Sequence, residues 1–173
     1  SRHGTTTFIV DPHESANVSG LAGIDYIVDQ TEDVSANVFV MMPSCVPATS
    51  IDDNGCTLTA EDMAPYLKNK RILGLGEVMD YISVVNGEAG MHQKLTLFEN
   101  RVRDGHAPFL AERDLQAYVM AGIKTDHECS GFEYAMRERR NGMTILIREG
   151  SAARNVDAIV SGLVENHMTG EGF

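Results

Sequence analysis

The chain has 173 residues, of which 43% are hydrophobic and 23% are charged, a composition typical of one globular domain and not of a disordered protein. Its formal net charge of -11 argues against nucleic acid and anionic membranes as partners, because phosphate groups would be repelled. No apolar segment approaches the roughly 20 residues of a membrane-spanning helix, and no leader-like segment begins the sequence, so we expect a cytoplasmic protein.

The three cysteines, Cys45, Cys56 and Cys129, are odd in number and show no Cys-x-x-Cys spacing. This pattern argues against a disulfide framework and against a zinc ribbon. We interpret the cysteines as buried or unreactive thiols in a reducing compartment.

Six short apolar or β-branched segments alternate with longer segments in which apolar residues recur every three or four positions. The short segments predict strands and the longer ones predict helices. The predicted strands are 5–11, 37–43, 71–77, 101–106, 122–127 and 143–149, and the predicted helices lie within 14–30, 59–70, 87–100, 112–122, 131–142 and 151–167. Such alternation is typical of parallel strands joined by crossover helices in an α/β domain.

Several helix ends carry recognisable signals. Thr59 and Asp62 have the spacing of a capping box, and Glu61 adds negative charge to the same first turn, which predicts a helix beginning after Thr59. Gly122 and Gly142 are expected to end their helices in the left-handed conformation.

Two α/β architectures fit the alternation, an open doubly wound sheet and a (β/α)8 barrel. Titratable residues stand at or near the C-terminal ends of most predicted strands, namely Asp11, Glu77, His106, His127 and Glu149. A barrel gathers such residues around one mouth, whereas an open sheet spreads them along an edge. The distribution therefore favours a barrel.

Glu77, His106 and His127 end three consecutive predicted strands, so their side chains would converge in a barrel. Imidazole binds borderline divalent cations such as Zn²⁺, Mn²⁺ and Fe²⁺, and a carboxylate offsets their charge. A divalent metal site is one interpretation, and ordinary hydrogen-bonded residues at strand ends are the other. The long-range spacing leaves both open.

Other motifs are ambiguous or unfavourable. The segment Gly74-Leu-Gly76 lacks the third glycine of a dinucleotide loop and is followed by an acid, so a nucleotide cofactor is not expected. His13, in the segment DPHE, fits either a functional site or a helix start. Arg148 and Ser151 fit either an anion-binding helix start or a plain cap.

Six segments occur in one order, from His3 to about Asn155: HGTTTFIVDPHE, PSCVPAT, GLGEVM, DGHAP, AGIKTDHE and IREGSAARN. Together they resemble the bacterial adenine deaminases of the amidohydrolase superfamily. The resemblance implies a metal-dependent (β/α)8 barrel that hydrolyses adenine to hypoxanthine and ammonia. The implied cofactor is a two-ion centre of a divalent metal, Mn²⁺ or Fe²⁺, with Zn²⁺ as an alternative.

The resemblance also implies roles for individual residues. Glu77 corresponds to the metal-bridging carboxylate of the family, and His106 and His127 to ligands of one ion. The glycines before Glu77 are then expected to keep the strand end open around a ligand. His13 and Glu128 lie in matching motifs and are expected to polarise the substrate or transfer protons, and Asp126 or Glu128 to orient the imidazoles.

Part of the family pattern is not found in this sequence. The family holds its other ion through a His-x-His pair after the first barrel strand and an Asp after the last strand, and neither is present. Six of eight strand–helix units are predicted here, and a complete barrel takes about 250 residues. We therefore expect residues 1–173 to be the central part of the hydrolase barrel domain, with no second domain, either in a homo-oligomer or completed by missing segments.

The expected activity is hydrolytic deamination of adenine, a purine substrate. Two alternatives stay open. One is a related amidohydrolase acting on another cyclic amine or amide, because the metal residues do not specify the ring. The other is a non-catalytic fragment or metal-binding module, inactive alone, because half of the expected metal ligands are not in the sequence.

Overall fold

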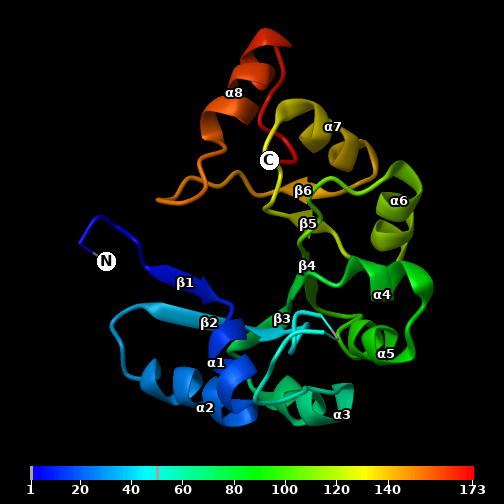
Figure 1. Cartoon of the computed structure of the whole chain (residues 1–173). Helices are drawn as coiled ribbons and strands as arrows, with labels where there is room; N and C mark the ends of the chain where they lie inside the picture. The colour runs from blue at the N-terminus through cyan, green and yellow to red at the C-terminus, as the bar shows by residue number, and fades with distance from the viewer. Residues whose placement is uncertain (1, 50) are drawn as a thin grey trace.

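The computed structural model describes residues 2–49 and 51–173, and each of the six predicted strands forms within it (Figure 1). All strand pairs are parallel. Four strands form one sheet in the order β1 (Thr7–Val10), β2 (Asn37–Pro43), β3 (Ile72–Val78) and β4 (Val102–Gly105), and β5 (Thr125–Asp126) pairs with β6 (Thr144–Ile145). The β5–β6 pair is a separate small sheet that lies next to β4, where the backbone N–H of Lys124 donates to Arg103 O at 3.4 Å.

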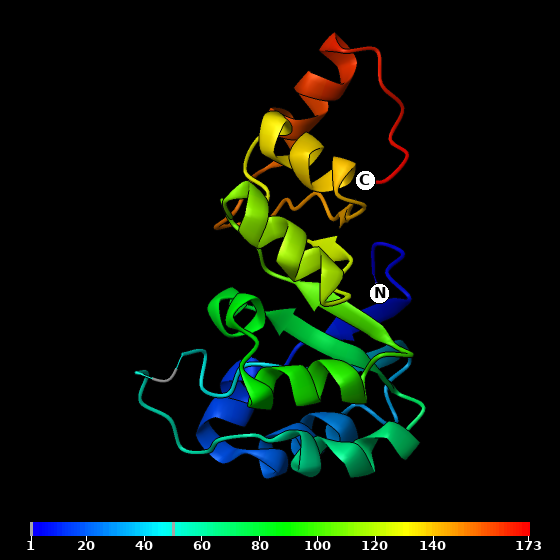
Figure 2. The ribbon, with the colours of Figure 1, turned by 90° about the vertical axis from the view of Figure 1, so that its right-hand side faces the viewer.

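A helix follows each strand, and the helices lie on the outer side of the curved sheet (Figures 1 and 2). They are α1 (His13–Ser19), α2 (Leu21–Gln30), α3 (Ala60–Met63) with the 3-10 helix η1 (Ala64–Lys68), α4 (Tyr81–Asn86), α5 (Ala89–Leu97), α6 (Glu112–Met120), α7 (Phe132–Arg140) and α8 (Val156–Glu165). Curled parallel strands with helices outside are the geometry of a (β/α)8 barrel. The prediction of a partial barrel is therefore confirmed.

Some helix boundaries differ from the sequence prediction. The segment 14–30 is two helices, because Gly20 has φ of 61° and packs so closely on Cys56 that any side chain would collide. Residues 81–86 form α4, which the apolar periodicity did not predict. Its cap is Asp80, whose Oδ1 accepts from Ser83 N at 3.0 Å.

The predicted helix-end signals have mixed outcomes. The capping box at Thr59 is confirmed, since Thr59 N donates to Asp62 Oδ2 at 2.8 Å and Thr59 Oγ1 accepts from Asp62 N at 3.3 Å. Gly122 and Gly142 end their helices at φ of 93° and 87°, as expected. The cap interpretation of Ser151 is wrong, because α8 begins five residues later, at Val156.

The buried core lies between the sheet and the helices, and one polar contact in it reaches the C-terminal ends of the strands. Tyr118 of α6 is fully buried. Its hydroxyl donates to Val78 O at 2.6 Å and accepts from His106 N at 2.9 Å. Because one side chain binds the backbone at the ends of both β3 and β4, it fixes the separation of the residues that follow these strands.

A second buried polar cluster joins β5 to α7. Both oxygens of Asp126 accept backbone N–H groups, from Ala107 at 2.7 Å and from Glu128 at 2.9 Å. Cys129 Sγ donates to Glu138 Oε2 at 2.6 Å. Burial, together with the nearby charge of Asp126, raises the pKa of Glu138 to about 8.

The concave side of the sheet leaves apolar side chains exposed. Ile9, Val102 and Leu146 are 62%, 52% and 47% exposed, and all three line a hollow of about 360 Å³. In a closed barrel such residues fill the interior. Within the described residues, no helix combines the length and the apolar character that crossing a bilayer requires.

The raised pKa of Glu138 predicts a pH-dependent stability. Between pH 4.5 and about 8 the folded protein keeps a proton that the unfolded chain loses, so the free energy of unfolding falls as pH rises through this window. Glu138→Gln should remove this dependence and gain stability relative to the wild type as pH rises. Urea unfolding at several pH values measures this pH dependence. Glu133→Gln, at an exposed position on the same helix, is the control. Parallel pH profiles for wild type and Glu138→Gln would contradict the prediction.

Candidate metal centre

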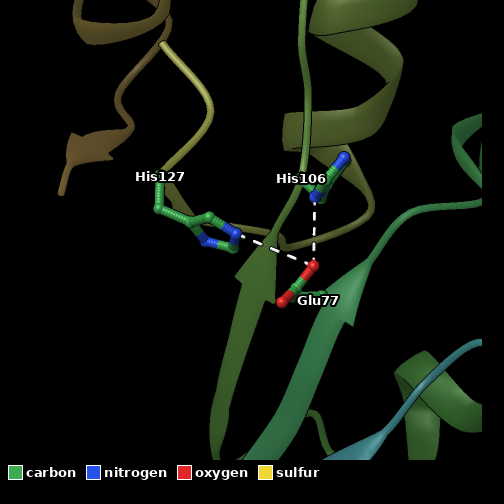
Figure 3. Close-up of side chains that lie close together, drawn as sticks. All are labelled: Glu77, His106 and His127. Atoms are coloured by element: carbon green, nitrogen blue, oxygen red, sulfur yellow. Dashed lines mark hydrogen bonds and ion pairs between the residues drawn. The ribbon is translucent and has the colours of Figure 1, made fainter. Parts of the chain in front are cut away.

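Glu77, His106 and His127 come together at the C-terminal ends of β3, β4 and β5 (Figure 3). Glu77 Oε2 lies 3.1 Å from His106 Nδ1 and 3.7 Å from His127 Nε2. The two imidazole rings are 5.7 Å apart between centroids and nearly perpendicular. One carboxylate oxygen therefore faces a nitrogen of each ring, which is the convergence expected from strand order.

An irregularity in β3 directs Glu77 into this position. Between Leu75 and Val78 the strand advances three residues, while the paired segment of β4, from Arg103 to Gly105, advances two. One extra residue in a strand is a β-bulge, which changes the direction of the neighbouring side chains.

Gly76 serves a different purpose from the one expected. A Cβ on Gly76 would overlap the carboxylate of Asp11, and one on Gly74 would overlap Val102 O. The expectation that these glycines keep the strand end open around a ligand is therefore wrong as stated. Asp11 fills the space beside Gly76, and the absence of a side chain there admits a second carboxylate to the site.

The charges of the three central residues support one another. The hydrogen bond with His106, and then the nearby imidazole of His127, hold the pKa of Glu77 well below its ordinary value. Asp104, whose Oδ2 lies 3.4 Å from His127 Nδ1, and then Glu77 raise the pKa of His127 to about 10. Because a raised pKa favours the protonated imidazole, a cation that binds His127 is expected to displace a proton from it.

His13 forms a second group with Asp11 and Glu77. His13 Nδ1 lies 2.6 Å from Asp11 Oδ1. Burial disfavours the charged imidazole, but the contact with Asp11 outweighs it and raises the pKa of His13. His13 Nε2 and Asp11 Oδ2 are buried and lack hydrogen-bond partners among residues 2–49 and 51–173. Such orphaned atoms beside a charged cluster indicate that a ligand or ion belongs there.

Glu128 follows His127 and borders the same site. Its Oε1 lies 3.8 Å from His106 Nδ1 and 3.6 Å from His127 Nε2. Arg148 donates to both of its oxygens, at 3.0 Å for Nη2 to Oε2. The five predicted site residues therefore lie in one region, with Glu77 shared by the two groups.

Three neighbours of the site were not assigned a role from the sequence, although Asp11 was expected at the barrel mouth. Asp104 lies inside β4 beside His127, Asp11 contacts His13, and Arg148 binds Glu128. Asp104 takes the orienting role suggested for Asp126, whose oxygens bind backbone N–H groups instead. Asp104 stands two residues before His106 in the predicted strand 101–106, which could have indicated an inward-facing side chain, because strand side chains alternate with period two.

The donor set fits a divalent cation. One ligand atom from each of Glu77, His106 and His127 lies within 4.8 Å of the others, and the same holds for Asp11, His13 and Glu77. Two imidazoles with a carboxylate suit zinc, iron or manganese, and a carboxylate shared by both groups could contact two ions.

The role of Asp104 can be tested in the metal-free protein. The pKa of His127 rises from 6.5 to about 10 on folding, so the protonated imidazole stabilises the folded protein. This contribution to the free energy of unfolding is fully present below pH 6.5 and is lost as pH rises through about 10. Asp104→Asn should lower this pKa, whereas Asp157→Asn on α8 should leave it unchanged. Titration of the imidazole by NMR measures both. A His127 that titrates near 6.5 in the wild type would contradict the assignment.

Comparison with known proteins assigns the family. Residues 1–164 match the model of the Amidohydrolase family. Adenine deaminase from Desulfitobacterium hafniense (strain Y51) is 59% identical over 170 residues, covering 98% of this chain and 30% of that protein. Adenine deaminase from Clostridium acetobutylicum is 50% identical over 162 residues, covering 92% and 28%, and that from Methanoculleus marisnigri is 48% identical over 154 residues, covering 89% and 29%.

The chain thus spans about 30% of the length of the curated relatives that it matches. The match extends over nearly all of this chain, so it includes every residue of the site described above. The chain belongs to the amidohydrolase family.

Proposed function

We propose that this chain is the central, metal-binding part of an adenine deaminase, which hydrolyses adenine to hypoxanthine and ammonia. The relatives named adenine deaminase support the reaction. The observation that carries the proposal is the position of Glu77 Oε2, 3.1 and 3.7 Å from imidazole nitrogens on the next two strands.

Membership of the amidohydrolase family implies a divalent metal. In the proposed site Glu77, His106 and His127 would hold the ion, and Mn²⁺ or Fe²⁺ is the proposed metal, with Zn²⁺ as the alternative. When bound, the metal supplies Lewis-acid chemistry that makes water a nucleophile at neutral pH.

His13 is the proposed proton-transfer residue. Its Nδ1 contacts Asp11, which fixes the ring, while its Nε2 has no partner in the described part of the chain. A ring nitrogen in that state can accept a proton and deliver it to the departing amine. Glu128, bound through both oxygens by Arg148, is better suited to accept a hydrogen bond from an N–H group of the substrate than to deliver a proton.

The remaining strands of the barrel are proposed to come either from flanking polypeptide or from a second copy of the chain. The free edge of β1 and the exposed side chains of Ile9, Val102 and Leu146 support this proposal, because a parallel sheet is normally covered on both faces.

Loss of a ligand should reduce metal binding. Glu77→Gln and His106→Ala should each weaken Mn²⁺ binding by more than about tenfold, since changes even outside the ligand shell cost that much. His92→Ala is the matched control, because its ring contacts Val84 O within α4 and α5. Elemental analysis after equilibrium dialysis gives the stoichiometry. Equal metal content in the wild type and both ligand variants would contradict the assignment.

Once flanking polypeptide or a second copy supplies the remaining strands, the activity of the complete barrel should depend on His13. His13→Ala should lower kcat for adenine by about 10²- to 10⁴-fold, the usual contribution of general acid–base catalysis. Hypoxanthine formation, followed by ultraviolet absorbance, measures this. Guanine, cytosine and cyclic amides serve as alternative substrates. A higher kcat/KM for one of them than for adenine would contradict the proposed substrate.

A further inference from the structure

Arg148 and Glu128 form a two-point ion pair between the segments that follow β5 and β6. Nη1 of Arg148 donates to Glu128 Oε1, and Nη2 donates to Oε2 at 3.0 Å. Paired N–H groups on one carboxylate make a charge-assisted interaction with defined geometry, which a lysine cannot reproduce. Glu128 is 18% exposed and Arg148 37%, so the pair is only partly screened by water.

The pair lies at the edge of the proposed metal site. Glu128 Oε1 is 3.8 Å from His106 Nδ1 and 3.6 Å from His127 Nε2, the same nitrogens that face Glu77 Oε2. A free carboxylate at that distance would be drawn to a divalent cation held by these imidazoles. The guanidinium occupies both of its oxygens instead.

We propose that Arg148 is a positioning residue that holds Glu128 away from the cation. The inference rests on the proposed metal centre. The ion is then bound by Glu77, His106 and His127 alone and keeps a coordination position open for a reacting group, as catalytic sites do and closed structural sites do not.

The structure makes Arg148 suitable for mutation. Its guanidinium has no side-chain partner other than Glu128 within the described ranges, and its Nε is buried without a partner. Removing the guanidinium therefore releases Glu128 without breaking other hydrogen bonds of that side chain.

Cobalt provides a direct measure of the coordination number, because the visible absorption of Co²⁺ weakens as ligands are added. The protein is stripped of metal, loaded with Co²⁺ and compared with Arg148→Ala, Glu128→Gln and the double variant. Arg148→Ala should bind Co²⁺ about tenfold more tightly, the usual scale of outer-shell effects, and should absorb less. Glu128→Gln should keep the wild-type spectrum, and the double variant should regain it.

Arg148→Lys provides a second route if Arg148→Ala does not fold. Lysine keeps the positive charge but lacks the paired N–H groups that bind both oxygens of Glu128. The Co²⁺ spectrum should therefore change in the same direction by a smaller amount. An altered spectrum for Glu128→Gln would show that Glu128 is already a ligand and would overturn the inference. Unchanged spectra for both Arg148 variants would do the same. A wild type that binds no Co²⁺ would refute the metal centre itself, so the two failures are distinguishable.

Discussion

The carboxylate of Glu77 between two imidazoles is the interaction on which the site depends. Three parallel strands end side by side, and each contributes one of these groups at its C-terminal end. Parallel strands place such residues at one edge whatever the length of the connecting helices, so residues 77, 106 and 127 meet although they are far apart in sequence. The contacts with His106 and then His127 lower the pKa of Glu77, and Asp104 first and Glu77 second raise the pKa of His127.

Contacts beneath the site hold these strand ends at the right separation. The hydroxyl of Tyr118 joins Val78 to His106, and the missing side chain of Gly76 admits Asp11 next to Glu77. Two charged residues outside the ligand set hold residues of the site in place: Asp104 contacts His127, and Arg148 binds Glu128. The scaffold thus fixes both the charge and the direction of each group, which is what a metal site requires of its surroundings.

The strands and the central residues could be predicted because both follow from local patterns: apolar segments form the strands, and polar residues follow their ends. The contacts of Asp104 and Arg148 could not, because they depend on the β3–β4 register and on the path of the chain after β6. The contact between Gly76 and Asp11 could not be predicted for the same reason, since the two residues are 65 positions apart in the sequence. The break at Gly20 needed knowledge of its packing on Cys56.

The most direct test of the central claim is a crystal structure of the protein grown with Mn²⁺, with anomalous scattering recorded to locate the ion. An anomalous peak is expected between Glu77, His106 and His127, within direct bonding distance of one ligand atom of each. Ordered side chains in the arrangement described above, with the manganese bound elsewhere on the molecule, would contradict it.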